Sequence, residues 1–238
     1  MSKVMTFNGT PSTDASFGIK VLQKVSRPIS SGSRVRTEEI TGGDGVYFHG
    51  KDRKELYIPV KFYMSATSMA NKRTAIRAIA AWLEVDEPAI LIFDDEPLKR
   101  YYAIPIDTID IDEVVYQGYG TVRFLVPSGY AESTSTKTAS PNSGTLETPV
   151  AITATMVTAS ATLKIDCGDE HILITTPLVV ADEIIIDTNT RYVTLNGADI
   201  REYVSFGSDY FKLPVGVFTL TPTPANTTVA VVFRERWK

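Results

Sequence analysis

The residues that could do acid, base or nucleophilic chemistry are few and scattered along the 238-residue chain. The two histidines, His49 and His171, are far apart, and neither lies beside a serine or cysteine in a recognisable nucleophile motif. The single cysteine, Cys167, alternates with Leu163 and Ile165, which predicts a buried small apolar side chain and not a reactive thiol. One cysteine also excludes an internal disulfide and a cysteine-based zinc site.

Acidic residues form three clusters that could act as acid/base pairs or as metal ligands. A glycosidase needs two carboxylates about 5–10 Å apart with separated pKa values, and a calcium loop of the EF-hand type needs a spacing and a glycine that are absent. Turn chemistry explains Asp94, Asp95 and Asp169 without any ligand. We therefore expect no enzyme, no metal and no other cofactor. The clusters are Asp94, Asp95 and Glu96; Asp107, Asp110, Asp112 and Glu113; and Asp166, Asp169 and Glu170.

The glycine-rich run Gly42-Gly43-Asp44-Gly45 could suggest a phosphate-binding loop. Such a loop must lead from a strand into the N-terminus of a helix, whereas a strand pattern follows this one. Charges alternate along the preceding arm, with Arg34 and Arg36 facing one way and Val35 the other. Residues 34–48 are therefore predicted to form a long, exposed hairpin with a glycine-rich tip.

The composition is that of a soluble globular protein with a mild net charge of -4. No basic excess indicates nucleic-acid binding, and no stretch approaches the roughly 18 apolar residues of a membrane span. The N-terminus has no basic-then-apolar signal segment, so we expect the chain to be made and folded in a cytosol.

One convincing helix is predicted over residues 68–84. Ser68 is a suitable N-cap, and Pro88 lies just beyond the end, where it could not continue the helix. Helical spacing predicts an apolar face formed by Met69, Ile76, Ile79, Ala80 and Leu83.

The remaining faces of this helix are less usual. Lys72, Arg73 and Arg77 lie toward its N-terminal end, where the helix dipole disfavours cations. They form either a solvated basic face or a surface for an acidic partner. Trp82 stands with alanines where an ordinary surface helix would carry charge, so the second half of the helix is expected to be covered on more than one side.

Around this helix, the first half of the chain shows strand patterns, which together predict an α+β domain of mainly antiparallel strands. The clearest strand is residues 56–64, within which Pro59 cannot donate a ladder hydrogen bond and so indicates an edge strand or a bulge. The other strand patterns lie at residues 4–7, 18–25, 89–93, 101–106, 114–116 and 121–126.

The second half of the chain differs from the first in composition and in its predicted elements. Residues 131–148 are rich in serine and threonine and poor in apolar residues, which is typical of a linker. About eight short alternating runs follow, separated by turn signals, and they predict an all-β sandwich. We therefore expect a domain at 1–130, a linker at 131–148 and a second domain at 149–238. The runs lie at residues 152–157, 162–167, 171–175, 183–187, 192–195, 210–213, 217–220 and 228–233.

A succession of short motifs resembles the distal tail proteins of long-tailed siphophages, in the right order and over nearly the whole chain. In the first half these are RTEEI at 36–40, GDGVY at 43–47, the strand at 55–63, AIAAWL at 78–83, and IFDDEP at 92–97 with YYA at 101–103. In the second half they are EIIID at 183–187, RYVTLNG at 191–197 and SDYFKLPVG at 208–216.

The resemblance implies a structural virion protein at the phage tail tip, assembled in the bacterial host cytoplasm. Proteins of this kind form a ring, usually a hexamer, at the distal end of the tail. The implied partners are further copies of the chain, the tail tube protein, a tail-tip or tail-associated protein and a receptor-binding protein, with no specific nucleic acid and no membrane insertion. The second domain is implied to be a galectin-like or carbohydrate-module-like β-sandwich.

A closed ring needs a head-to-tail interface on each protomer. An extended hairpin can add to the edge of a neighbour's sheet, and the charges along it would set the register of that contact. The candidate interface residues are Arg34, Arg36, Glu38, Glu39, Tyr47, Lys72, Arg73, Arg77 and Trp82. The alternative is a cell-surface or cell-wall carbohydrate-binding module that acts through the second domain, although no galectin-type set of His, Asn, Arg and Trp is visible.

Overall fold

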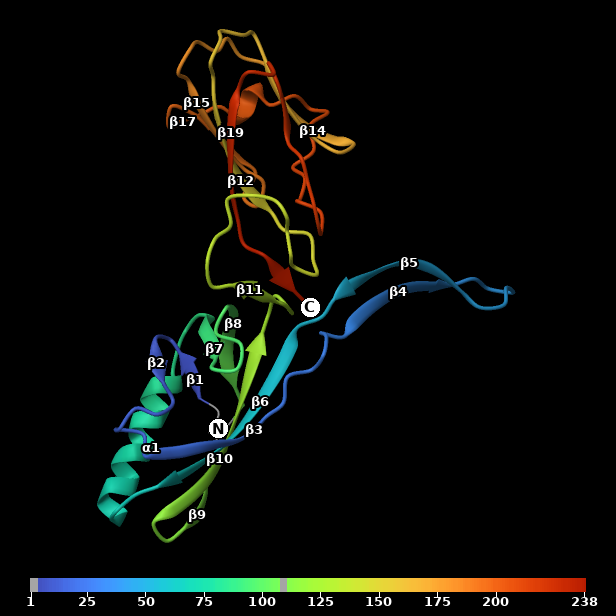
Figure 1. Ribbon diagram of the computed structural model, residues 1–238. Helices are drawn as coiled ribbons and strands as arrows, with labels where there is room; N and C mark the ends of the chain where they lie inside the picture. Colours follow the sequence, from blue (N-terminus) through green and yellow to red (C-terminus); the bar gives the residue numbers. More distant parts are fainter. Residues whose placement is uncertain (1–3, 108–110) are drawn as a thin grey trace. The chain divides into compact units, whose positions relative to one another are not determined.

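The computed structural model describes residues 4–107 and 111–238 of the chain (Figure 1). It divides into two compact units, the first ending at Glu132 and the second covering Ser133–Trp237. Unit 1 contains a helix against a mainly antiparallel sheet, and unit 2 is built of strands, which confirms the predicted fold class.

The main sheet of unit 1 has the strand order β2-β1-β7-β8-β10-β6-β3, with β9 paired to β10 and β11 to β8. A second sheet contains only β4 and β5. The strands are β1 (Met5–Phe7), β2 (Thr10–Pro11), β3 (Ile19–Val25), β4 (Ser33–Glu39), β5 (Val46–Arg53), β6 (Leu56–Ser65), β7 (Ala89–Phe93), β8 (Lys99–Ile106), β9 (Ile111–Val114), β10 (Gln117–Val126) and β11 (Ala131–Ser133).

The helix α1 (Met69–Leu83) begins at the predicted N-cap, where the Ser68 hydroxyl accepts a hydrogen bond from the backbone N–H of Asn71 at 3.2 Å. The predicted apolar face is partly wrong, because Met69 and Ala80 are exposed. Trp82 fixes which side of α1 faces the core, because its ring stacks on that of Phe17 with the ring centroids 4.6 Å apart. The residues that α1 buries are Lys72, Ala75, Ile79, Trp82 and Leu83.

Strand β6 is an interior strand, paired to β10 on one side and to β3 on the other. The expectation that Pro59 marks an edge strand is therefore wrong. Ser26 donates its N–H to the carbonyl of Pro59, and the N and C=O groups of one strand residue point to the same side. The proline nitrogen thus faces β3 next to Val60, the last residue of β6 that pairs with that strand, so the missing N–H lies at the end of the ladder and not within it. The register shifts lie in β3 and not at the proline.

Gly118 and Gly120, which lie between the strand patterns predicted at residues 114–116 and 121–126, are part of β10. Both face the core, and a Cβ atom added at Gly120 would overlap the ring of Phe62. The missing side chains therefore make room for the large side chains of β6.

Unit 2 consists of two sheets with the strand orders β17-β16-β15-β12-β19 and β14-β13-β18, whose apolar side chains form one core. This confirms the predicted β-sandwich. Its elements are β12 (Val150–Thr155), β13 (Leu163–Cys167), β14 (Glu170–Ile174), β15 (Glu183–Asp187), β16 (Tyr192–Leu195), β17 (Ala198–Asp199), the 3-10 helix η1 (Arg201–Tyr203), β18 (Thr221–Thr223), β19 (Thr228–Phe233) and β20 (Arg236–Trp237).

Two of the predicted strands, residues 210–213 and 217–220, are not strands. Phe211 and Leu213 are buried as their pattern indicated, but the backbone there is held by isolated bridges such as Leu213–Thr148. The residues expected to form a linker supply these partners. The amide of Asn142 is fully buried and donates to the carbonyl of Leu146 at 3.1 Å, so most of the serine- and threonine-rich segment is folded into unit 2.

Within the described ranges, no helix is long and apolar enough to cross a membrane.

Candidate protomer interface

Strands β4 and β5 form a two-stranded arm (residues 33–53) that pairs with no other strand of unit 1. Its strand residues are exposed apart from the half-buried Gly50, and Figure 1 shows the arm projecting away from the sheet that contains β3 and β6. This confirms the long, exposed hairpin predicted from the alternating charges and the glycine-rich tip. A hairpin without a covering layer is marginally stable by itself, which makes this arm a candidate surface for a partner.

A bulge sorts the arm into two faces. Arg36 pairs with Gly50 and Thr37 with Phe48, so His49 is the extra residue on β5. Because of this shift, Phe48 and Val46 lie on the same face as Val35. These three apolar side chains remain 64%, 55% and 54% exposed, respectively.

The opposite face of the arm is charged. Arg36 pairs with Asp52 at 3.2 Å, and Glu38 lies 2.9 Å from the Nε2 atom of the bulged His49. All four side chains are more than half exposed, so such pairs contribute little to stability. Two of the predicted interface residues, Arg36 and Glu38, thus form ion pairs within the arm. The other three on the arm, Arg34, Glu39 and Tyr47, are also exposed.

The predicted residues on α1 separate into two groups. Arg73 and Arg77 are exposed, as expected. Lys72 is fully buried, and its Nζ atom donates to the carbonyl of Val115 at 3.0 Å, so the expectation that it lies on a solvated basic face is wrong. Trp82 is buried in unit 1, where its indole N–H donates to the carbonyl of Phe7 at 3.0 Å. The helical spacing of Lys72, Ala75, Ile79 and Trp82 could have predicted this buried face. The lysine among them made the face look polar in the sequence.

Several acids of the three clusters pair with nearby cations. Asp95 and Glu96 both bind the guanidinium of Arg27. Lys164 pairs with Asp166 at 2.6 Å. Asp110 of the second cluster lies outside the described residues. Across the described ranges, no three His, Cys, Asp or Glu side chains are grouped so that they could hold a metal ion.

The remaining reactive groups are also accounted for by packing. Cys167 is buried as predicted, and burial raises the pKa of its thiol, which disfavours the nucleophilic thiolate. His49 belongs to the arm and His171 to β14 in the other unit, so the structure brings neither histidine to a nucleophile.

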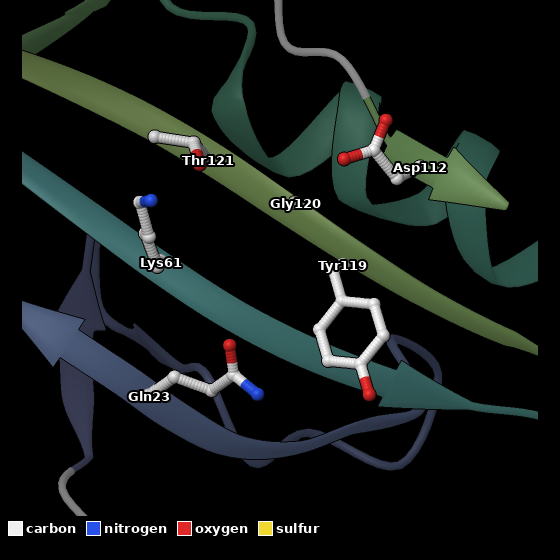
Figure 2. Close-up of a pocket in the computed structure, with 6 residues that line it drawn as sticks. All are labelled: Gln23, Lys61, Asp112, Tyr119, Gly120 and Thr121. Atoms are coloured by element: carbon white, nitrogen blue, oxygen red, sulfur yellow. The ribbon is translucent and has the colours of Figure 1, made fainter.

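An open pocket of about 340 Å³ lies on the sheet of unit 1, where β3, β6, β9 and β10 contribute its lining (Figure 2). Lys61 and Asp112 approach the hollow from different strands, and the side chains of Gln23, Tyr119 and Thr121 complete its polar wall. The lining contains one cationic and one anionic side chain together with neutral hydrogen-bonding groups, but no histidine or cysteine. It suits contact with a polar surface better than covalent chemistry.

Two family matches cover most of the chain. Residues 13–126 match the phage tail protein RIFT-related domain, and residues 143–237 match the C-terminal domain of the siphovirus-type tail component. No curated protein matches the sequence.

Among solved structures, the chain is similar to the crystal structure of the SPP1 Dit (gp 19.1) protein, described as a paradigm of the hub adsorption apparatus in phages that infect Gram-positive bacteria. The TM-score is 0.83 at 17% identity, with 100% of both chains covered, which establishes the shared fold. A chain of the phage P2 baseplate in its activated conformation with Ca gives a TM-score of 0.45 at 9% identity, covering 99% of this chain and 98% of that one. The two family matches show that the chain is made of the two domains of siphovirus-type phage tail proteins.

Proposed function

We propose that this protein is a structural virion component that assembles head to tail into a hexameric ring at the distal end of a siphophage tail. The ring joins the tail tube to the baseplate or tip proteins. The two tail protein domains and the fold shared with the SPP1 hub protein support this role.

The observation that carries the proposal is the arm. Its apolar face, formed by Val35, Val46 and Phe48, is uncovered in the single chain although it belongs to a regular two-stranded ladder. A surface on one end of a protomer that fits a different surface on the next gives a heterologous contact, and such contacts form a ring where the rotation between neighbours closes. Burial of this face against a neighbouring copy removes exposed apolar area from water.

Native mass spectrometry of the purified chain at two concentrations tests the ring. We expect a dominant hexamer whose population rises with concentration. A matched variant replaces residues 34–52 with a short glycine–serine loop, which leaves the main sheet intact because the arm shares no strand pairing with it. We expect that variant to remain folded and monomeric. A hexamer without the arm would disprove the arm's role, and a monomeric parent chain would disprove self-assembly.

The charges along the arm give a finer test. Simultaneous reversal of Arg34, Arg36, Glu38 and Glu39 should abolish the hexamer while circular dichroism stays unchanged, because these side chains are exposed. Single substitutions to alanine at these positions should have little effect, since exposed ion pairs are weak. An intact ring in the fourfold variant would remove the charge pattern from the contact.

The proposed place and partners follow from the ring. The tail tube protein lies on one side and a tail-tip or tail-associated protein on the other, with a receptor-binding protein attached at the periphery. Assembly occurs in the host cytoplasm, before the tail is complete. Cross-linking of purified virions followed by mass spectrometry should yield links from this chain to those neighbours, and absence of the chain from virions would contradict the proposal.

A second candidate function, carbohydrate binding by unit 2, has one specific observation in its favour. Arg201 lies over the exposed ring of Tyr192 at 5.0 Å and is held by Asp199 at 2.6 Å, so an aromatic ring and a fixed polar pair are presented together. Sugars bind to such combinations. Titration of cell-wall glycans into the full chain, with Tyr192→Ala as control, would support this function only if the substitution abolished binding.

A further inference from the structure

We propose that Asn8 is a modification site, at which the side-chain amide is lost spontaneously to give aspartate and isoaspartate. The chain has two Asn-Gly pairs, Asn8-Gly9 and Asn196-Gly197. Asparagine is a thermolabile residue, and a following glycine favours the reaction because it has no side chain to hinder attack by its backbone nitrogen. The structure leaves the first pair free to react and holds the second. This inference is independent of the proposed ring.

The two pairs occupy nearly identical turns. Each is the two-residue loop of a hairpin, the first between β1 and β2 and the second between β16 and β17. The φ angles are 48° and 49° for the asparagines and 78° and 85° for the glycines, which is typical of the type I′ turn. Each asparagine also donates its backbone N–H to a carbonyl of the neighbouring strand, at 2.9 Å and 2.8 Å. Backbone geometry therefore does not distinguish the two sites.

The glycine nitrogens of the two turns are equally available. All four residues are exposed, and a Cβ atom added at either glycine would meet nothing within 4 Å. Neither glycine N–H donates a hydrogen bond to another described residue. The strands that follow, β2 and β17, have two residues each and lie at the ends of their sheets, where local opening costs little free energy.

The side chains of the two asparagines differ. The amide of Asn196 is fixed at both ends, because its Oδ1 atom accepts from the N–H of Glu183 at 2.9 Å and its Nδ2 atom donates to Asp182 at 2.8 Å. The amide of Asn8 makes no hydrogen bond to the described part of the chain. Asn8 is therefore free to rotate toward the Gly9 nitrogen, whereas Asn196 must first break two hydrogen bonds.

The reaction needs only water. The backbone nitrogen of Gly9 gives its proton to the solvent and attacks the Cγ atom of Asn8. The new N–Cγ bond closes a five-membered succinimide, the Cγ–Nδ2 bond breaks, and Nδ2 takes up a proton and leaves as ammonia. One water then adds to either carbonyl carbon of the ring and opens it, which yields aspartate or isoaspartate. An amide and a water thus become a carboxylic acid and ammonia, with no change of oxidation state.

Isoaspartate at this turn would affect the core of unit 1. The chain would then continue through the former side-chain carbon, which adds one CH2 group to the backbone of a two-residue loop. The register of this hairpin lets Ser12 donate its N–H to the carbonyl of Met5 at 2.7 Å and accept the N–H of Met5 at 3.2 Å. The carbonyl of Phe7 accepts the indole N–H of Trp82. A longer loop displaces these buried partners and lowers the stability of unit 1.

Incubation of the purified full chain in neutral buffer tests the proposal. Peptide mapping by mass spectrometry detects the change from amide to acid at each site, and labelling with an isoaspartyl methyltransferase counts the isoaspartate. We expect Asn8 to convert at least about tenfold faster than Asn196, because the latter must first lose two hydrogen bonds. Equal rates at the two sites, or faster conversion of Asn196, would overturn the proposal.

The same incubation in urea is the internal control. Unfolding removes the turns and the hydrogen bonds of Asn196, so the two Asn-Gly pairs should then react within about twofold of each other. A difference of about tenfold that persists in urea would show that the neighbouring sequence and not the folded structure sets the contrast, and would overturn the structural explanation.

Asp182→Ala tests the anchoring of the protected site. The substitution removes the acceptor of the Asn196 Nδ2 atom, so Asn196 should convert several-fold faster. Asn8 lies in the other unit, and its rate in the same sample should stay that of the parent. An unchanged rate at Asn196 would overturn the role of this hydrogen bond.

Asn8→Gln tests the consequence for the fold, because its longer side chain cannot close the five-membered ring. The aged parent chain should unfold at a lower urea concentration than fresh protein, whereas the aged Asn8→Gln variant should keep its midpoint. A parent sample that contains mostly isoaspartate at this position and still unfolds at the original midpoint would overturn the effect on unit 1.

Discussion

The arm and the β6–β10 pair are both antiparallel ladders within unit 1, yet they differ in the burial of their side chains. In β6 every second residue from Leu56 to Met64 is buried, and in β10 the alternate residues face the same core. In the arm the same alternation of apolar and charged side chains leads to no burial at all. Alternation therefore predicts a strand pair in both cases, but only a covering layer turns the apolar face into a core.

The difference indicates what the arm is for. Phe62 on the β6–β10 ladder is buried, whereas Phe48 on the arm is mostly exposed. The same unit therefore covers the aromatic side chain of one ladder and leaves that of the other in solvent. The uncovered apolar face fits the proposal that the arm is an interface with another molecule. The following predictions test this contrast, from the largest expected effect on stability to the smallest.

Phe62→Ala should destabilise unit 1 by about 3–5 kcal/mol, because the fully buried ring fills the space above Gly120 and its removal leaves a cavity. Urea unfolding of the purified chain measures the change. Phe62→Leu, which keeps most of the volume, should recover a large part of the loss. An effect below about 1 kcal/mol for the alanine variant would mean that the β6–β10 ladder is not the centre of the core.

Lys72→Ala should destabilise unit 1 by about 2 kcal/mol, since it removes a buried stem and the hydrogen bond to the carbonyl of Val115. Arg77→Ala on the exposed side of the same helix should change the unfolding free energy by less than about 0.5 kcal/mol. The same urea assay compares the two. Equal effects would contradict the assignment of one basic residue to the core and the other to the surface.

Asp182, in a turn of unit 2, allows the same comparison between a side chain with partners inside its unit and an exposed one. Hydrogen bonds from the backbone of Val179 and from the Asn196 side chain lower the pKa of its carboxyl below the ordinary value of 3.8. A lowered folded-state pKa stabilises the protein above about pH 4, and this contribution disappears as the pH falls through the folded value. The melting temperature of Asp182→Ala should therefore lie below that of the parent at pH 6, and the gap should narrow toward pH 2.

A matched variant at the exposed turn residue Asp169, changed to alanine, should melt close to the parent at both pH values. A gap for Asp182→Ala that stays constant from pH 6 to pH 2 would show that the carboxylate charge is not what holds the turn.

Phe48→Ala should leave the unfolding free energy of the monomer within about 0.5 kcal/mol of the parent, because the ring contacts little in the single chain. The same substitution should weaken self-association at least tenfold, since apolar aromatic anchors dominate interfaces. Leu98→Ala, another exposed apolar residue of unit 1, is the control and should change neither quantity. Unchanged association in Phe48→Ala would remove the apolar face of the arm from the interface.

Much of the fold was predictable because local patterns and covering layers agreed. The helix, its N-cap at Ser68 and the strands β15, β16 and β19 lie where the sequence patterns place them. The exposed arm was also predictable, from alternating charge and the glycines at its tip. The division of the chain was less so, because the polar segment before Pro149 contains buried partners such as Asn142 that composition cannot reveal.

The candidate interface shows the same division. The sequence alone determined that Arg34, Arg36 and Glu38 recur at every second position of an extended hairpin, since strand periodicity and turn chemistry are local properties. Only the tertiary structure decided that Lys72 and Trp82 face inward while Arg73 and Arg77 face outward. A helix with apolar residues on several sides has more than one possible buried face, and the choice depends on which of them finds the rings of Phe7 and Phe17.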